Sequence, residues 1–135
     1  MAIKMTVAVR NAMLDAIETA IGATAVLKIR TGAPPAAIAD ADSGTVLATL
    51  TLPADWMGAA AAGAKAKAGT WSDTSADATG TAAHFRLYAS DGTTQHMQGT
   101  ITATSGGGDM ELDNTSINAG QAVTITTFTL TAGNA

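Results

Sequence analysis

The spacing of apolar residues changes once along this chain, and the change restricts the folds that it can adopt. Over residues 6–21, large apolar side chains recur at every fourth position with alanines beside them: Val9, Met13, Ile17 and Ile21, then Ala12, Ala16 and Ala20. This repeat is typical of one face of an α-helix. Thr6 suits the N-cap of such a helix and Gly22 suits its end. The sequence predicts one helix whose apolar stripe packs on its own β body or on a neighbouring subunit.

From Ala25 onward the apolar period shortens to two, in short runs separated by Gly, Pro, Asp and Asn. Such runs are typical of β-sandwiches and barrels. We predict a mainly β fold, an antiparallel β-sandwich of about six to eight strands with one N-terminal α-helix. A chain of 135 residues has room for a single domain. In this domain, residues 1–22 form an N-terminal arm and helix and residues 25–135 form the sandwich, with a long irregular segment over 53–80.

The clearest predicted hairpin surrounds a turn at residues 91–93. Facing residues of two strands share a face, so the apolar positions match only if the turn holds an odd number of residues. A three-residue loop pairs Leu87 with Met97 and Phe85 with Gly99. The ring of Phe85 then covers the bare backbone of the glycine.

Both histidines fall on the outward face of this hairpin, His84 opposite Thr100 and His96 opposite Tyr88. Their rows lie four residues apart, which is about 13 Å at roughly 3.4 Å per residue. That separation is too large for the two rings to bind one metal ion. We expect both to be polar residues of the surface or of an interface.

Two further segments carry one prediction each. In the irregular segment, three alanines at alternate positions form the inner face of a strand whose outer face carries Lys65 and Lys67: Ala64, Ala66 and Ala68. Near the C-terminus, the apolar phase slips between Ile125 and Phe128. A β-bulge at residues 126–127 would return the apolar pairs on either side to one face.

Composition and charge exclude several partners. Hydrophobic residues make up 47% of the chain but aromatic ones only 4%, so we expect a thin core whose stability assembly would increase. The formal net charge is −4, and an acidic body repels the phosphates of nucleic acids. Charged residues at Lys4 and Arg10 interrupt any secretory leader, and no stretch approaches the roughly 20 apolar residues of a membrane span. We therefore expect no nucleic acid and no membrane among the partners.

No combination of residues predicts an enzyme. Asp109, Glu111 and Asp113 alternate along one strand and could face a calcium ion, but neighbours among them lie about 7 Å apart. We interpret them as a solvated face that resists aggregation. The glycines at 106–108 lack the Lys and Ser/Thr of a phosphate-binding loop, and no serine lies in a G-x-S-x-G elbow. We predict no catalytic residue, no cofactor and no metal ion.

Four residues of the irregular segment are candidate contacts with a larger assembly or with another subunit: Trp56, Lys65, Lys67 and Trp71. A tryptophan pair in loops can anchor a protein interface or stack on a sugar. The other interpretation is that the two indoles close the ends of the thin core. Core or interface packing is the interpretation that we favour for the indoles.

Six stretches resemble proteins from the virion modules of tailed-phage and prophage genomes. They are VRNAMLDAI (9–17), LKIRTGAPP (27–35), AHFRLYASDG (83–92), QHMQGT (95–100), DMELDN (109–114) and QAVTITTFTL (121–130). Together they span most of the chain. Within this group, the sequence looks most similar to the jelly-roll cement (decoration) proteins of capsids, as in the short-tailed Bordetella phage.

The resemblance implies a non-enzymatic subunit that binds the outer surface of the assembled head and stabilises the contacts between capsomers. Its partners would be the major capsid protein and a second copy of itself, as a dimer rather than a trimer. It would reside on the virion, and in the host cytoplasm during assembly. A structural protein of the tail or baseplate is the first alternative, and a carbohydrate-binding β-sandwich module is the second.

Overall fold

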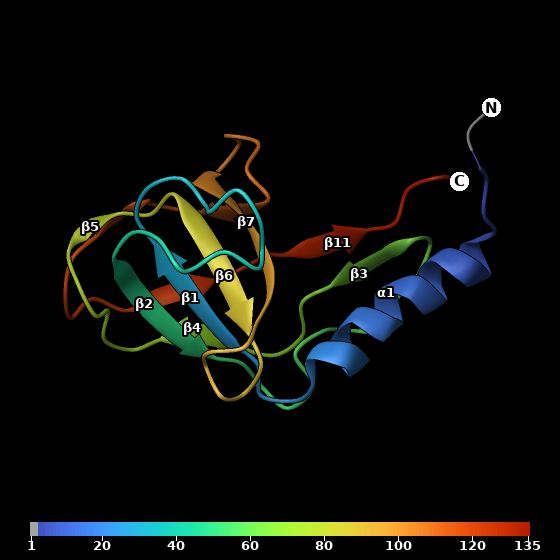
Figure 1. Cartoon of the computed structure of the whole chain (residues 1–135), viewed down its shortest axis with the longest axis horizontal. Coiled ribbons are helices and arrows are strands. Elements are labelled where there is room, and N and C mark those ends of the chain that lie inside the picture. The colour runs from blue at the N-terminus through green and yellow to red at the C-terminus, as the bar shows by residue number, and fades with distance from the viewer. Residues whose placement is uncertain (1–2) are drawn as a thin grey trace.

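The computed structural model describes residues 3–135, with one α-helix followed by eleven short strands (Figure 1). The elements are α1 (Val7–Ile21), β1 (Val26–Arg30), β2 (Val46–Thr51), β3 (Ala64–Ala66), β4 (Trp71–Asp73), β5 (Gly80–Thr81), β6 (His84–Tyr88), β7 (Gln95–Ala103), β8 (Met110–Leu112), β9 (Ser116–Ile117), β10 (Val123–Ile125) and β11 (Thr129–Thr131). The predicted class, mainly β with one N-terminal helix, is confirmed. The strands outnumber the predicted six to eight because seven of them are pairings of only two or three residues.

The largest sheet has the strand order β2-β1-β6-β7-β8, and it curls so that one face encloses the core. All of its neighbours are antiparallel except β7 and β8, which run parallel. Three two-stranded pairings complete the fold: β10 with β4, β11 with β3, and β5 with β9.

The predicted register of the hairpin is confirmed, but its turn is different. Leu87 faces Met97 and Phe85 faces Gly99. The loop has four residues, because the Ala89 amide donates a hydrogen bond to the Thr94 carbonyl at 2.9 Å. A bulge after Leu87 adds one unpaired residue, so the apolar side chains of both strands still lie on the same face.

The bulge also changes the position of His96. Tyr88 pairs with Gln95, so the prediction that His96 lies opposite Tyr88 is wrong. The four-residue loop is favoured over the three-residue one because the Asp91 carboxylate accepts hydrogen bonds from the amides of Thr93 and Thr94, each at 2.9 Å. His84 does face Thr100, as predicted.

A chain of four aromatic rings runs through the core. The ring centroids lie 6.1 Å apart for Trp56 and Trp71, 5.7 Å for Trp71 and Phe128, and 5.8 Å for Phe85 and Phe128. Phe85 also covers Gly99, because a Cβ on that glycine would lie 2.7 Å from the ring atom Cε1. The few aromatic side chains therefore fill the centre of a core that is otherwise aliphatic.

Two strand predictions near the ends of the fold are wrong. β3 faces the other way, with Lys65 buried and Ala66 exposed, because α1 covers that face and supplies carboxylates to the lysine. The expected bulge at residues 126–127 is instead a break between two strands. β10 pairs with β4, whereas β11 pairs with β3, so the chain changes partner between Ile125 and Thr129.

The helix and the β3–β11 pair form an arm that extends from the β body (Figure 1). At its tip the Met5 amide donates a hydrogen bond to the Asn134 carbonyl at 2.7 Å. Thr6 caps α1 as predicted, since its Oγ1 accepts a hydrogen bond from the Val9 amide at 3.4 Å. The helix stops at Gly22, whose φ of 93° favours glycine. Only the second half of the predicted stripe faces the protein. Ile21 is buried and Ile17 packs against the core, beside Arg10 and Leu14, whereas Val9 and Met13 are exposed.

Candidate functional site

Residues 31–44, which we call the clamped loop, cover the outer face of β1 and β6. The loop is held mainly by polar side chains of the sheet beneath it. The guanidinium group of Arg86, which is fully buried, donates hydrogen bonds to the carbonyl oxygens of Ala37, Ile38 and Asp40 at 3.0–3.3 Å. The amide of Gln98 donates another to the Pro35 carbonyl at 2.7 Å. These contacts fix the backbone of the loop along most of its length.

Asp42 closes the far end of the clamped loop. Its Oδ1 accepts hydrogen bonds from Arg86 Nη1 and from the Tyr88 hydroxyl, both at 2.7 Å, and its Oδ2 accepts one from Arg30 Nη2 at 2.8 Å. Burial raises the pKa of the Asp42 carboxyl, but the bonds from Tyr88 and Arg86 and the charges of both arginines outweigh burial and lower that pKa overall. Asp42 is therefore ionised and neutralises part of the charge of two buried guanidinium groups.

His84 closes the near end of the clamped loop. Its Nδ1 lies 2.6 Å from the Gly32 carbonyl oxygen, so Nδ1 carries the proton and donates it. Burial, joined by the charges of Arg30 and Arg86, lowers the pKa of this ring despite the bond to Gly32. This neutral histidine and the side chains of Arg30, Arg86, Tyr88 and Gln98, with Asp42, hold the clamped loop on the sheet, and we call this group the clamp. His96 lies exposed at the hairpin bulge, so the structure does not bring the two histidines together.

The clamped loop presents a small apolar surface. Ala33, Ala36, Ala37, Ile38 and Ala39 are all exposed, and residues 31–39 contain no charge. A loop held from below loses little further entropy when a partner covers it, so its contacts contribute more fully to binding. We regard the clamped loop as the candidate binding surface of the protein.

The clamp was not predicted from the sequence, although a signal for it exists. Basic side chains alternate on the outward face of two neighbouring strands, at Lys28, Arg30 and Arg86, beside a loop that contains Asp40 and Asp42. Positive rows next to an acidic loop are expected to pair. The alternation by itself indicates that these basic side chains point away from the core. It does not show that a loop covers them.

The two tryptophans lie inside the protein, as the interpretation that they pack in the core predicts, which removes them as candidate surface contacts. Trp56 and Trp71 are both buried, and each indole N–H is satisfied internally. Trp56 Nε1 donates to the Gly22 carbonyl at 2.9 Å, and Trp71 Nε1 donates to the carbonyls of Trp56 and Ala68 at 3.2 and 3.1 Å. Neither indole is available to a sugar or to another protein.

Lys65 is also internal, which corrects its proposed role as a surface contact. Its Nζ lies 2.8 Å from Asp15 Oδ1, 3.1 Å from Glu18 Oε2 and 2.8 Å from the Gly58 carbonyl. Burial lowers the pKa of Lys65, but the bonds to Asp15 and Glu18 outweigh it and raise the pKa overall. The lysine therefore remains charged and holds α1 against β3.

Lys67 is the one predicted contact residue that stays at the surface. It is half-buried, and its Nζ donates to the Gly69 carbonyl at 2.8 Å while lying 5.7 Å from the centroid of the Trp71 ring. The four proposed contact residues do not form one surface. Trp56, Lys65 and Trp71 are buried, and only Lys67 is exposed enough to contact a partner.

The two lysines should respond very differently to charge reversal. We expect Lys65→Glu to lower the free energy of unfolding by about 3 kcal/mol. The substitution removes the buried ammonium group that Asp15 and Glu18 share and places a third carboxylate beside them. Lys67→Glu should change it by less than about 1 kcal/mol, the size of an exposed cation–π contact. Urea denaturation followed by circular dichroism measures both variants. Equal effects of the two substitutions would contradict the assigned positions.

Two of the three alternating carboxylates accept hydrogen bonds from the preceding strand and loop. Asp109 Oδ2 accepts hydrogen bonds from the Thr100 amide at 2.9 Å and from its hydroxyl at 3.0 Å. Glu111 accepts bonds from the amides of Ser105 and Gly107 at 3.0 and 3.2 Å. Within residues 3–135, no three His, Cys, Asp or Glu side chains are grouped closely enough to hold a metal ion.

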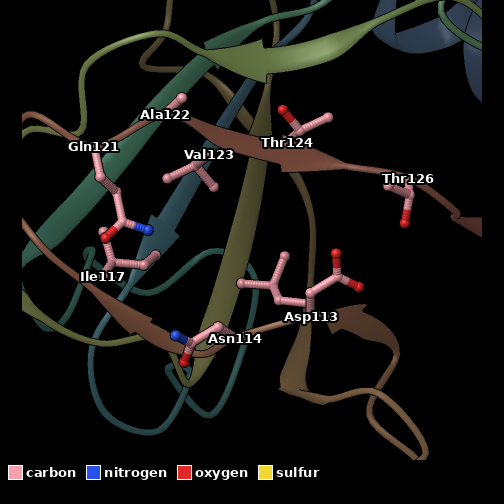
Figure 2. A pocket seen from close by; sticks show the side chains of 9 residues that line it. Asp113, Asn114, Ile117, Gln121, Ala122, Val123, Thr124 and Thr126 are labelled. Carbon is pink, nitrogen blue, oxygen red and sulfur yellow. The ribbon is translucent and has the colours of Figure 1, made fainter.

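A shallow pocket of about 230 Å³ lies between the segment after β8 and the segment around β10 (Figure 2). Asp113 and Asn114 line one side, and Gln121, Val123 and Thr124 line the other. Its only charged side chain is Asp113, and no histidine, cysteine or serine lines it. Its polar lining consists of one carboxylate, two amide side chains and threonine hydroxyls.

Comparisons with known proteins give no relative for this chain. No family model, no curated protein and no solved structure matches it. In the part of the chain that the structure describes, the single helix is too short and too polar to cross a bilayer.

Proposed function

We propose that this protein is a non-enzymatic structural subunit of a tailed-phage particle, a cement protein that binds the outside of the assembled head. The six stretches that resemble virion proteins support the phage assignment. The clamped loop is the observation that carries the binding role, because it presents an uncharged apolar surface at a fixed position.

A cement protein needs no chemistry, only a surface that recognises the finished shell. Many copies that bind the assembled shell and not its separated capsomers stabilise it by mass action. A rigid loop suits this role, since each copy then gives up little conformational freedom on binding. The acidic body suits it as well, because it disfavours contact with packaged DNA.

The clamped loop should be the part of the subunit that meets the shell. Ile38 is its largest exposed apolar side chain, so Ile38→Asp should weaken binding to purified heads about tenfold or more, by burying an unpaired charge in the contact. Co-sedimentation of the subunit with heads measures this. Thr70→Asp is the control, because Thr70 is exposed outside the loop. Unchanged binding of Ile38→Asp would remove the loop from the contact.

The tail or baseplate alternative uses the same kind of subunit on another part of the particle. Binding to isolated tails but not to heads would favour it. The carbohydrate-binding alternative depended on an exposed tryptophan pair. Because both indoles are buried, no specific observation now favours a sugar ligand.

A further inference from the structure

His84 is a buried side chain with one paired and one unpaired ring nitrogen. The residue is fully buried on β6, and its Nδ1 donates a hydrogen bond to the Gly32 carbonyl of the clamped loop at 2.6 Å. Its Nε2 is buried too and has no hydrogen-bond partner within residues 3–135. Because Nδ1 carries the proton of the neutral ring, a second proton can bind only at Nε2.

Positive charges on two strands oppose that second proton. Arg30 of β1 pairs directly with His84 in the sheet, and Arg86 lies two residues along β6 on the same outer face. Both guanidinium groups are themselves buried. An imidazolium at this position would therefore have two positive neighbours in a region that water does not reach.

The carboxylates around the ring already accept other hydrogen bonds. In the clamped loop, Asp42 accepts bonds from both arginines and from the Tyr88 hydroxyl, and Asp40 accepts one from the Ala37 amide at 2.9 Å. On the other side of His84, β7 contributes the uncharged Thr100, whose amide and hydroxyl donate to Asp109.

We propose that the clamped loop is acid-sensitive, and that it leaves the sheet when His84 takes up a proton at Nε2. The closed loop would bury the new N–H without an acceptor, whereas the open loop gives it access to water. The core lies on the opposite face of this sheet, so it can stay closed while residues 31–44 move away. This device belongs to the free subunit and holds whether or not the loop binds a shell.

The direction of the pH effect follows from the pKa of the ring. Burial lowers the pKa of His84 from its ordinary value of 6.5, and the charges of Arg30 and Arg86 lower it further. The bond to Gly32 and the charge of Asp42 offset this only in part. The open loop thus binds the proton more tightly, so the closed loop is fully favoured above pH 6.5 and loses stability as the pH falls below that value.

His84 is the member of the clamp whose charge changes between about pH 5 and 6.5. The guanidinium groups stay charged throughout this range. The pKa of Asp42 is lowered from 3.8, and burial raises the pKa of Tyr88 above 10.0. His96, the other histidine, is exposed at the hairpin bulge outside the clamp. Mild acid therefore acts on the loop through one ring.

Amide hydrogen exchange of the whole chain at pH 7.5 and pH 5, corrected for the intrinsic exchange rate at each pH, tests the proposal. The amides of residues 31–44 should lose about fivefold or more of their protection at pH 5, the factor that corresponds to the smallest usual cost of an unpaired buried donor. The amides of α1 should keep theirs. Equal protection of residues 31–44 at the two pH values would overturn the proposal.

Two matched variants assign the effect to one histidine. The amide of His84→Asn can still donate to the Gly32 carbonyl but takes up no proton, so its loop should show the same protection at both pH values. His96→Asn should retain the pH dependence of the wild type. The ratio between the two pH values separates titration of His84 from a merely structural loss, which would lower protection equally at both. Retention of the wild-type ratio in His84→Asn would contradict the assignment.

Nitrogen chemical shifts of the histidine rings test the same device in the wild type, without any substitution. The ring of His84 should be the Nδ1–H tautomer at pH 7.5 and should titrate with a midpoint below its ordinary value of 6.5. A midpoint at or above that value would show that the closed loop does not resist the proton, and would overturn the proposal.

Discussion

Asp42→Ala should lower the free energy of unfolding by about 3 kcal/mol. Removing one partner of a buried ion pair costs about 3–5 kcal/mol, because the other charge stays buried without compensation. Here two guanidinium groups lose their shared carboxylate, and that of Arg86 is fully buried. The side chain of Asp42 is itself 38% exposed, and screening by water places the expected cost at the lower end of that range.

Urea denaturation measures this loss, and two other substitutions serve as controls. Asp113→Ala removes an exposed carboxylate outside the clamp and should change stability by less than about 0.5 kcal/mol. Asp42→Asn keeps hydrogen-bonding atoms and removes only the charge, so its effect should fall between the other two. Limited proteolysis should cut the Asp42→Ala protein within residues 31–44 first. Equal stability of the two alanine variants would show that the clamp does not hold the fold.

Trp71→Ala should cost about 3–5 kcal/mol, the usual loss when a large aromatic side chain is removed from a core. Trp71 lies between Trp56 and Phe128 in the aromatic chain, so its removal leaves a cavity that neither neighbour can fill without moving. Trp71→Phe keeps a ring but loses the two hydrogen bonds from Nε1. Its cost should be smaller, about 1–3 kcal/mol.

The midpoint of thermal unfolding, followed by circular dichroism, ranks the wild type, Trp71→Phe and Trp71→Ala in that order. The same three proteins distinguish the core position of Trp71 from a surface role. A Trp71→Ala protein with wild-type stability and impaired binding to heads would restore the interpretation of the indole as a surface anchor.

Features set by local spacing were predictable from the sequence. The four-residue repeat before Gly22 located α1 to within one residue, and the alternation around Phe85 and Leu87 gave the hairpin register. Both features depend on which positions are apolar. The length of the turn at Asp91 could not be predicted, because a four-residue loop with a bulge places the apolar side chains on the same face as a three-residue loop without one.

Features that depend on which segment packs over a strand face could not be predicted from local spacing. Alternation correctly separated Lys65 from its alanine neighbours but could not show that α1 covers the lysine's face. The stripe at Val9 and Met13 was identified correctly as apolar, yet the polar flank at Asn11 decided which side packs. The candidate binding surface was missed for the same reason, since Arg86 lies on an outward face that a distant loop covers.

Electron cryo-microscopy of the intact particle tests the proposal that this chain is a subunit of the outer capsid surface. We expect density for the β body and its arm on the outside of the shell, with the clamped loop against the capsid protein. Density for the chain in the tail alone, with an undecorated shell, would contradict it.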